Sequence, residues 1–204
     1  MSAGLRLTRR ALLATVIVGA TAGTGRAQSL SEPELANALR RGGYVILMRH
    51  ASSPREAPDA AAAQPDNTAR ERQLDAAGRL SSTAMGEALR RLGIPITEVF
   101  TSPTYRARET VRLLGLTNPT PVAELGDEGQ SMRDASSAQA LWLQRIVNSI
   151  TFGNWLVVTH LPNITAAFPR LTTVADGESI VFRREGGGAS IVARVPIEEW
   201  TRLQ

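Results

Sequence analysis

The sequence predicts an α/β protein, a three-layer sandwich in which helices cover both faces of a mostly parallel sheet. Two continuous apolar runs, Tyr44–Met48 and Trp155–Thr159, are typical of central strands that are buried on both faces. Helical patterns and a further strand pattern at Glu98–Thr101 lie between them. Strands that alternate with helices along a chain favour parallel pairing. The length of 204 residues suits one domain, and no internal repeat is present.

The predicted domain begins with a short helix and the first strand. Ser31 and Glu34 have the spacing of a capping box, in which each side chain accepts a backbone N–H of the other residue. Gly42 ends this helix, and the strand Tyr44–Met48 follows. A polar stretch rich in Ala, Pro and Asp then covers about Ser52–Arg72. It is too long for an ordinary connection, so we expect a lid or a binding loop.

The middle of the chain predicts two helices on either side of the strand Glu98–Thr101. Residues near 82–92 place Met85 and Leu89 on one apolar helical face. After the strand, Ser102 and Pro103 suit the N-cap and the first helical position of the next helix.

The last third of the chain predicts the remaining helix and strands. They are, in order, a loop over residues 124–129, a helix at about Ser137–Ile150, the strand Trp155–Thr159, two β runs at Ser179–Arg183 and Ser190–Val195 around a turn at Glu185–Gly188, and a short helix near Glu198–Leu203. Nothing in this order indicates a second domain.

The formal net charge of +4 belongs to the start of the chain. All 23 basic residues are Arg, and four of them, Arg6, Arg9, Arg10 and Arg26, lie within the first 27 residues, where no acid occurs. The other 19 Arg are balanced by 19 Asp and Glu. The remainder of the chain is therefore formally neutral, and we expect no nucleic-acid partner.

Residues 1–27 have the pattern of an export signal. Arg9-Arg10 precedes the apolar run Ala11–Ala20, and small residues lead to Ala27. The run is shorter than the roughly 20 residues that span a bilayer, so we expect cleavage after Ala27 and an exported domain over 28–204, periplasmic or secreted. Contact with a membrane would then occur only through the signal. The paired arginines are also typical of a twin-arginine signal. The alternative is an apolar N-terminal helix that stays packed or membrane-bound.

The chain has two histidines, and both follow predicted strands. His50 lies just past Tyr44–Met48, and His160 comes directly after Trp155–Thr159. Because the carboxyl ends of parallel strands meet at one edge of a sheet, we expect both to lie with Arg49 and Arg106. Guanidiniums and imidazoles that converge in this way make an anion site, and a phosphoryl group suits it because Arg binds phosphate bidentately. A lone histidine at a strand end is more often structural, so the prediction rests on the combination.

Three segments resemble the histidine phosphatase (phosphoglycerate mutase-like) superfamily and occur in its order. They are Arg49-His50-Ala51 with Gln73–Arg79, Thr101–Thr110, and Val158-Thr159-His160. The resemblance runs from about residue 44 to the end of the chain and implies a phosphoglycerate mutase-like fold. It also implies that His50 is a nucleophile that takes the phosphoryl group onto a ring nitrogen.

The resemblance further implies which residues hold the phosphoryl oxygens. These are Arg49, Arg106 and His160. Arg72 is similar to a basic residue of the small phosphohistidine phosphatase branch and would add a phosphate contact, a role for which Arg55 competes.

Members of the family usually protonate the leaving group with a carboxylic acid from the loop after the Arg106 helix. Val122–Leu125 resembles that segment, which makes Glu124 the first choice, with Asp127 and Glu128 close behind. Glu109 suits this role less, because it lies three residues beyond Arg106 on one helix face, where we expect an ion pair with an Arg.

These features together predict a metal-independent phosphatase without a cofactor, acting on a small phosphorylated substrate or a phosphoprotein. Fixed cations can stabilise a phosphoryl transition state without a metal, and the absence of Cys excludes disulfides, thiolate zinc sites and cysteine nucleophiles. One alternative is a catalytically silent phospholigand-binding module on the same fold. Another is a metal hydrolase that uses His50 and His160 with a carboxylate, which the adjacent Arg residues disfavour.

Overall fold

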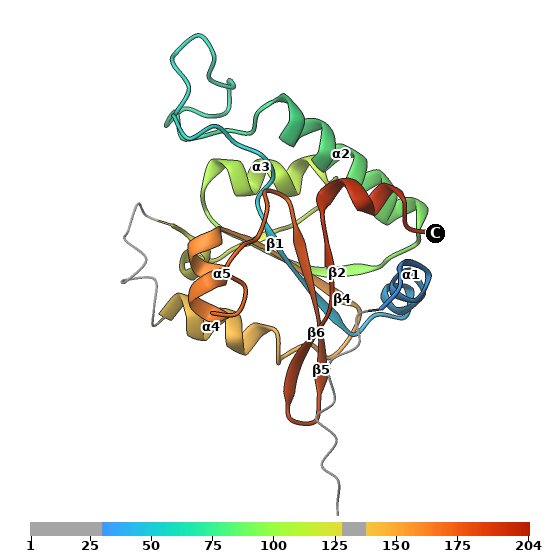
Figure 1. Ribbon diagram of the computed structural model, residues 1–204. Helices are drawn as coiled ribbons and strands as arrows, with labels where there is room; N and C mark the ends of the chain where they lie inside the picture. The colour runs from blue at the N-terminus through green and yellow to red at the C-terminus, as the bar shows by residue number, and fades with distance from the viewer. Residues whose placement is uncertain (1–29, 128–137) are drawn as a thin grey trace, which may run out of the picture.

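A six-stranded sheet in the order β3-β2-β4-β1-β5-β6 organises the computed structural model, which describes residues 30–127 and 138–204 (Figure 1). The four strands β1 to β4 run parallel, and β5 and β6 add an antiparallel hairpin next to β1. The strands are β1 (Tyr44–Arg49), β2 (Ile96–Thr101), β3 (Thr120–Pro121), β4 (Asn154–Thr159), β5 (Ser179–Glu185) and β6 (Gly188–Val195). The predicted three-layer α/β fold with a mostly parallel sheet is confirmed.

Helices cover both faces of the sheet, as the continuous apolar run of β1 requires. Ile46 and Met48 pack into a core cluster with α1, α2, α3 and η3, whereas Val45 and Leu47 face α4 and α5. All four side chains are fully buried. The helices are α1 (Glu32–Arg41), α2 (Ala76–Arg91), α3 (Tyr105–Leu113), α4 (Ala138–Ile146) and α5 (Leu161–Ala167), with short 3₁₀ segments η1 (Ala123–Leu125) and η3 (Ile197–Thr201).

Two predicted helix starts are wrong. The helix expected near 82–92 begins at Ala76, because the Asp75 carboxylate accepts the backbone N–H of Gly78 at 2.7 Å and caps it. The helix expected to begin at Ser102 begins at Tyr105 with Thr104 as its N-cap. The backbone N–H of Ser102 donates to the Val158 carbonyl at 2.9 Å, so Ser102 still belongs to the edge of the sheet.

Other boundaries differ in smaller ways. The helix expected over 137–150 ends at residue 146, and the last short helix is a 3₁₀ segment. The two-residue strand β3 and the 3₁₀ segment η1 stand where the sequence indicated only connecting chain.

The long stretch after β1 lies beyond α2 and α3 without helix or strand structure of its own (Figure 1). Its end is fastened to α3 by two carboxylates. Glu71 accepts the backbone N–H of Tyr105 at 2.7 Å, and Glu109 accepts the backbone N–H of Leu74 at 3.0 Å. The expected ion pair of Glu109 with an Arg is therefore wrong, since this carboxylate anchors the loop instead.

The predicted export signal over 1–27 and the candidate acid Glu128 lie outside the described residues. Within residues 30–127 and 138–204, no helix has the length and apolar character needed to cross a membrane.

Candidate active site

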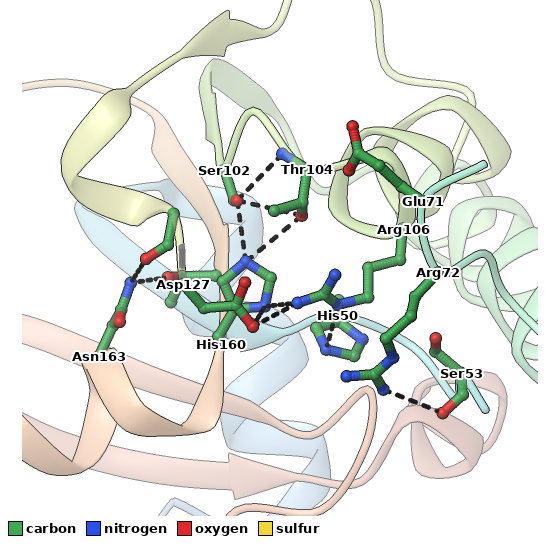
Figure 2. Close-up of polar contacts among 12 residues, drawn as sticks. His50, Ser53, Glu71, Arg72, Ser102, Thr104, Arg106, Asp127, His160 and Asn163 are labelled. Carbon is green, nitrogen blue, oxygen red and sulfur yellow. Dashed lines mark hydrogen bonds and ion pairs between the residues drawn. The ribbon is translucent and has the colours of Figure 1, made fainter. Parts of the chain in front are cut away.

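The ends of β1 and β4 bring the two histidines together, as the parallel sheet predicts. The backbone N–H of His50 donates to the Thr159 carbonyl at 2.9 Å, and the His50 and His160 ring centroids are 5.1 Å apart. Arg106 reaches both rings from the first turn of α3 (Figure 2). All three side chains are buried.

The hydrogen bonds of His50 fix its tautomer. Nδ1 lies 2.8 Å from the Ala51 carbonyl oxygen, which can only accept, so Nδ1 carries the proton. Nε2 lies 3.2 Å from Nε of Arg106, which can only donate, so Nε2 carries a lone pair. The free electron pair of His50 is therefore on Nε2 and faces the guanidinium.

His160 is held in the opposite tautomer. Its Nδ1 accepts from Nη2 of Arg106 at 3.1 Å. Its Nε2 lies 2.8 Å from the hydroxyl of Ser102 and 3.3 Å from that of Thr104 (Figure 2). The proton of His160 is therefore on Nε2, directed to hydroxyl groups at the β2–α3 junction.

Burial and the surrounding guanidiniums keep both imidazoles neutral. Burial, the neighbouring His160 and the charges of Arg106 and Arg49 lower the pKa of His50 to about 3. Burial and the charges of Arg106, Arg72 and Arg49 lower the pKa of His160 to about 2. A neutral imidazole can act as a nucleophile or accept a hydrogen bond, which an imidazolium cannot do.

Asp127 is the candidate acid that the structure places at this cluster. Its carboxylate forms an ion pair with Arg106, and Oδ2 lies 3.6 Å from Nδ1 of His160. The backbone carbonyl of Glu124 accepts from Asn163 at 3.4 Å, whereas its carboxylate forms no hydrogen bond or ion pair with Arg106 or either histidine. Of the two carboxylates, it is therefore that of Asp127 that pairs with Arg106.

Arg49 and Arg72 lie near the cluster, and their hydrogen bonds go to groups other than the two histidines. Arg49 donates to the Val174 carbonyl at 2.8 Å and forms an ion pair with Asp176 at 2.6 Å. Arg72 donates to the carbonyls of Pro54 and Ser53 at 2.6 and 3.3 Å. Burial and the charge of Arg106 lower the pKa of Arg72, as expected for cations that share a small volume.

The competing loop residue Arg55 is exposed. Of the two loop arginines, Arg72 is thus the one whose charge acts on the cluster.

Sequence reasoning missed several partners of the site. Ser102 was interpreted as a helix cap, whereas its hydroxyl contacts His160. Asp176 gave no local signal, because its partner Arg49 is distant in the chain. Asn163 lies one helical turn after Thr159, and that spacing beside His160 is the one signal by which it could have been found.

The arrangement suits an anion better than a metal ion. Among the side chains of the described ranges, no group of three or more His, Cys, Asp or Glu is placed to hold a metal. Three guanidiniums act on the two histidine rings, and together they favour a multiply charged anion.

A family model of the histidine phosphatase superfamily (branch 1) matches residues 45–127. The matched segment contains Arg49, His50, Arg72 and Arg106, and His160 lies beyond it. This match covers fewer than half of the 204 residues, so it shows a similarity of this segment to the superfamily. The resemblance predicted from the sequence motifs is confirmed.

Solved phosphatase structures share the fold of this chain. The protein histidine phosphatase SixA complexed with tungstate has a TM-score of 0.56 at 20% identity, covering 76% of this chain and 98% of that chain. A SixA protein from Nakamurella multipartitia has a TM-score of 0.52 at 19% identity, with coverages of 74% and 94%. A phosphoserine phosphatase from Entamoeba histolytica, complexed with phosphoserine, has a TM-score of 0.56 at 10% identity, with coverages of 76% and 98%. The search of curated proteins gave no match.

Proposed function

We propose that this protein is a phosphatase that works through a covalent phosphohistidine on Nε2 of His50. The observation that carries the proposal is the unprotonated Nε2 of a neutral imidazole, directed at a buried guanidinium. A neutral ring nitrogen is a competent nucleophile, and a covalent intermediate divides one difficult displacement into two easier ones.

The first half-reaction transfers the phosphoryl group to His50. The Nε2 lone pair attacks phosphorus, the P–O bond to the leaving group breaks, and that oxygen takes a proton from the Asp127 carboxyl. Positive charge then develops on the ring, and the Nδ1–H bond to the Ala51 carbonyl stabilises it. Arg106 holds the equatorial oxygens, where the charge of the transition state is spread. The bound phosphoryl dianion favours protonation of His160, whose Nδ1 then donates to a further equatorial oxygen.

The second half-reaction releases phosphate. Water attacks phosphorus, a proton of that water goes to the Asp127 carboxylate, and the electron pair of the N–P bond returns to Nε2. Asp127 then carries a proton, as it does in the substrate complex, and it releases this proton to solvent when phosphate leaves and the carboxylate pairs with Arg106 again. No step requires a metal ion, because the guanidiniums supply the positive charge.

Asp127 takes the role of the acid because of where its carboxylate lies. In the free site it is the counter-ion of Arg106. An arriving phosphoryl dianion competes for the same guanidinium and releases the carboxylate. Two adjacent anions repel each other, so the phosphoryl group also favours the protonated form of Asp127, which is the form that a general acid needs.

The substrate class is a phosphomonoester or a phosphorylated protein side chain. Arg49 and Arg72 add positive charge around the cluster and would attract such an anion or contact its phosphoryl oxygens. The names of the similar structures point to phosphohistidine and phosphoserine as compounds to test. The export signal predicted over 1–27 would give the enzyme a periplasmic or secreted location.

The test is turnover of p-nitrophenyl phosphate in the presence of EDTA, followed by acid-quench or alkaline-quench trapping of the phosphoenzyme. We expect activity with EDTA present and a phosphoryl group on Nε2 of His50. Attachment to Nδ1 of a histidine would place the group on His160 instead, and the mechanism would be wrong. Activity that depends on added metal would favour the metal hydrolase. Binding of inorganic phosphate without turnover of any phosphoester would favour a silent phospholigand-binding module.

A further inference from the structure

Two buried side chains hold the backbone immediately before Asp127. The Nδ2 amide of Asn163 donates to the Gly126 carbonyl at 2.8 Å, and the hydroxyl of Thr159 donates to the Leu125 carbonyl at 2.9 Å. The same Nδ2 donates to the Thr159 hydroxyl at 3.0 Å and lies 3.4 Å from the Glu124 carbonyl. Three consecutive carbonyls are thus bound by one Thr–Asn pair.

The orientation of the Asn163 amide is dictated by these partners. A reversed amide would direct its oxygen at the carbonyls of Gly126 and Glu124, which cannot donate. Both Asn163 and Thr159 are fully buried, so no water replaces the bonds if they are lost.

The pair also connects the acid to the second histidine. Thr159 ends β4, His160 is the N-cap of α5, and Asn163 lies in the first turn of that helix. The segment that leads to Asp127 is therefore attached to the same short stretch of chain that carries His160.

This attachment matters at the moment of reaction. In the free site the ion pair with Arg106 helps to hold the Asp127 carboxylate. In the proposed function, the phosphoryl group takes over that guanidinium, so the ion pair cannot hold the acid during proton transfer. What then keeps Asp127 in place is the backbone attachment.

We propose that Asn163 and Thr159 are positioning residues that hold Asp127 for protonation of the leaving group. The inference rests on the proposed phosphatase activity. It predicts that loss of the pair damages only the reactions that need a general acid, because proton transfer demands an oriented donor.

Two substrates whose leaving groups differ in their need for a proton test whether Asn163 and Thr159 act through the general acid. p-Nitrophenolate is a stable anion that departs with little help, whereas the alkoxide from glycerol phosphate needs a proton as it leaves. For Asn163→Ala and Thr159→Val, kcat/KM on glycerol phosphate should fall roughly 10- to 100-fold, whereas kcat/KM on p-nitrophenyl phosphate should change by less than about 3-fold. Thr159→Ser keeps the hydroxyl and should retain most of the activity on both substrates.

A double-variant comparison separates positioning from general damage. In an Asp127→Asn background the acid is already absent, so adding Asn163→Ala or Thr159→Val should cause no further loss on glycerol phosphate. Asn148→Ala is the matched control. The amide of Asn148, like that of Asn163, donates to a backbone carbonyl, that of Gln144 at 2.7 Å, but Asn148 is exposed. This substitution should leave both substrates unaffected.

The outcomes distinguish this inference from the proposed function. Equal losses on both substrates, or additive losses in the Asp127→Asn background, would mean that Asn163 and Thr159 only support the fold. If Asp127→Asn itself failed to discriminate between the substrates, the assignment of the acid would be wrong. Absence of turnover by the unaltered chain on either substrate would overturn the proposed function.

Discussion

The ends of β1 and β4 carry the same residue at neighbouring places, yet the chain uses the two histidines differently. Arg49 and Thr159, the residues just before them, are partners in the parallel register. His50 places its proton on a backbone carbonyl and leaves Nε2 free, whereas His160 places its proton on hydroxyl groups and leaves Nδ1 free. Both free nitrogens face Arg106. The second contact of each ring, not its position in the fold, separates their proposed roles.

Substitution of each histidine by Asn should give the largest difference between them. His50→Asn removes the proposed nucleophile, so activity on p-nitrophenyl phosphate should fall to the background rate and no phosphoenzyme should be trapped. His160→Asn removes the ring that, once protonated beside the bound phosphoryl group, holds one of its oxygens, and should cost about 10²- to 10³-fold in kcat, with phosphoenzyme still detectable. A trapped phosphoryl group in His50→Asn and none in His160→Asn would reverse the two roles.

A smaller loss of kcat is expected when the hydroxyl groups that contact Nε2 of His160 are removed. Ser102→Ala removes its nearer acceptor and should lower kcat by about 10-fold, because Thr104 remains at 3.3 Å. Adding Thr104→Val should lower kcat further, since the tautomer of His160 then has no hydroxyl partner. No side-chain substitution can do the same to His50, whose acceptor is a backbone carbonyl. Unchanged kinetics in the double variant would show that the tautomer of His160 is unimportant.

The smallest expected effect is on the free energy of unfolding at acidic pH. Folding lowers the pKa of both histidines, so both contribute in the same direction. Their folded pKa values, about 3 and about 2, lie below the unfolded value of about 6.5. Below pH 6.5 the unfolded chain therefore binds more protons, and the free energy of unfolding decreases as the pH falls toward the folded values. Each histidine can contribute up to about 1.4 kcal/mol per pH unit in that window.

Urea unfolding at pH 7 and pH 5 measures this loss. The decrease in the free energy of unfolding should be smaller in His50→Asn and in His160→Asn than in the unaltered chain, by a similar amount in each. A decrease of equal size in all three proteins would mean that the histidines titrate normally in the folded state.

Apolar patterns within short segments of the sequence predicted the central strands and the edge of the sheet at which the site residues meet. The apolar runs of β1 and β4 determine burial on both faces, and burial together with parallel pairing brings His50, His160 and Arg106 to one edge. The start of α2 was missed because a single carboxylate, Asp75, decides it.

The identity of the acid could not be decided from local sequence. Glu124 and Asp127 lie three residues apart on the same segment, and which carboxylate reaches Arg106 depends on how η1 packs. That packing depends on bonds to Thr159 and Asn163, more than 30 residues later in the chain. The partner of Glu109 could not be predicted from nearby residues either, since it is a backbone N–H 35 residues earlier.

The Arg106–Asp127 ion pair has a consequence for product release. A site built to bind a dianion tightly would also retain the inorganic phosphate that it produces. In the free site the Asp127 carboxylate is paired with the Arg106 guanidinium, and in the proposed reaction it would take the place of the departing phosphate. The buried cation would not remain without a counter-ion, so the proposed enzyme could release its product without leaving an uncompensated charge. For the proposed phosphatase, we expect this internal competitor to favour turnover at high phosphate concentrations.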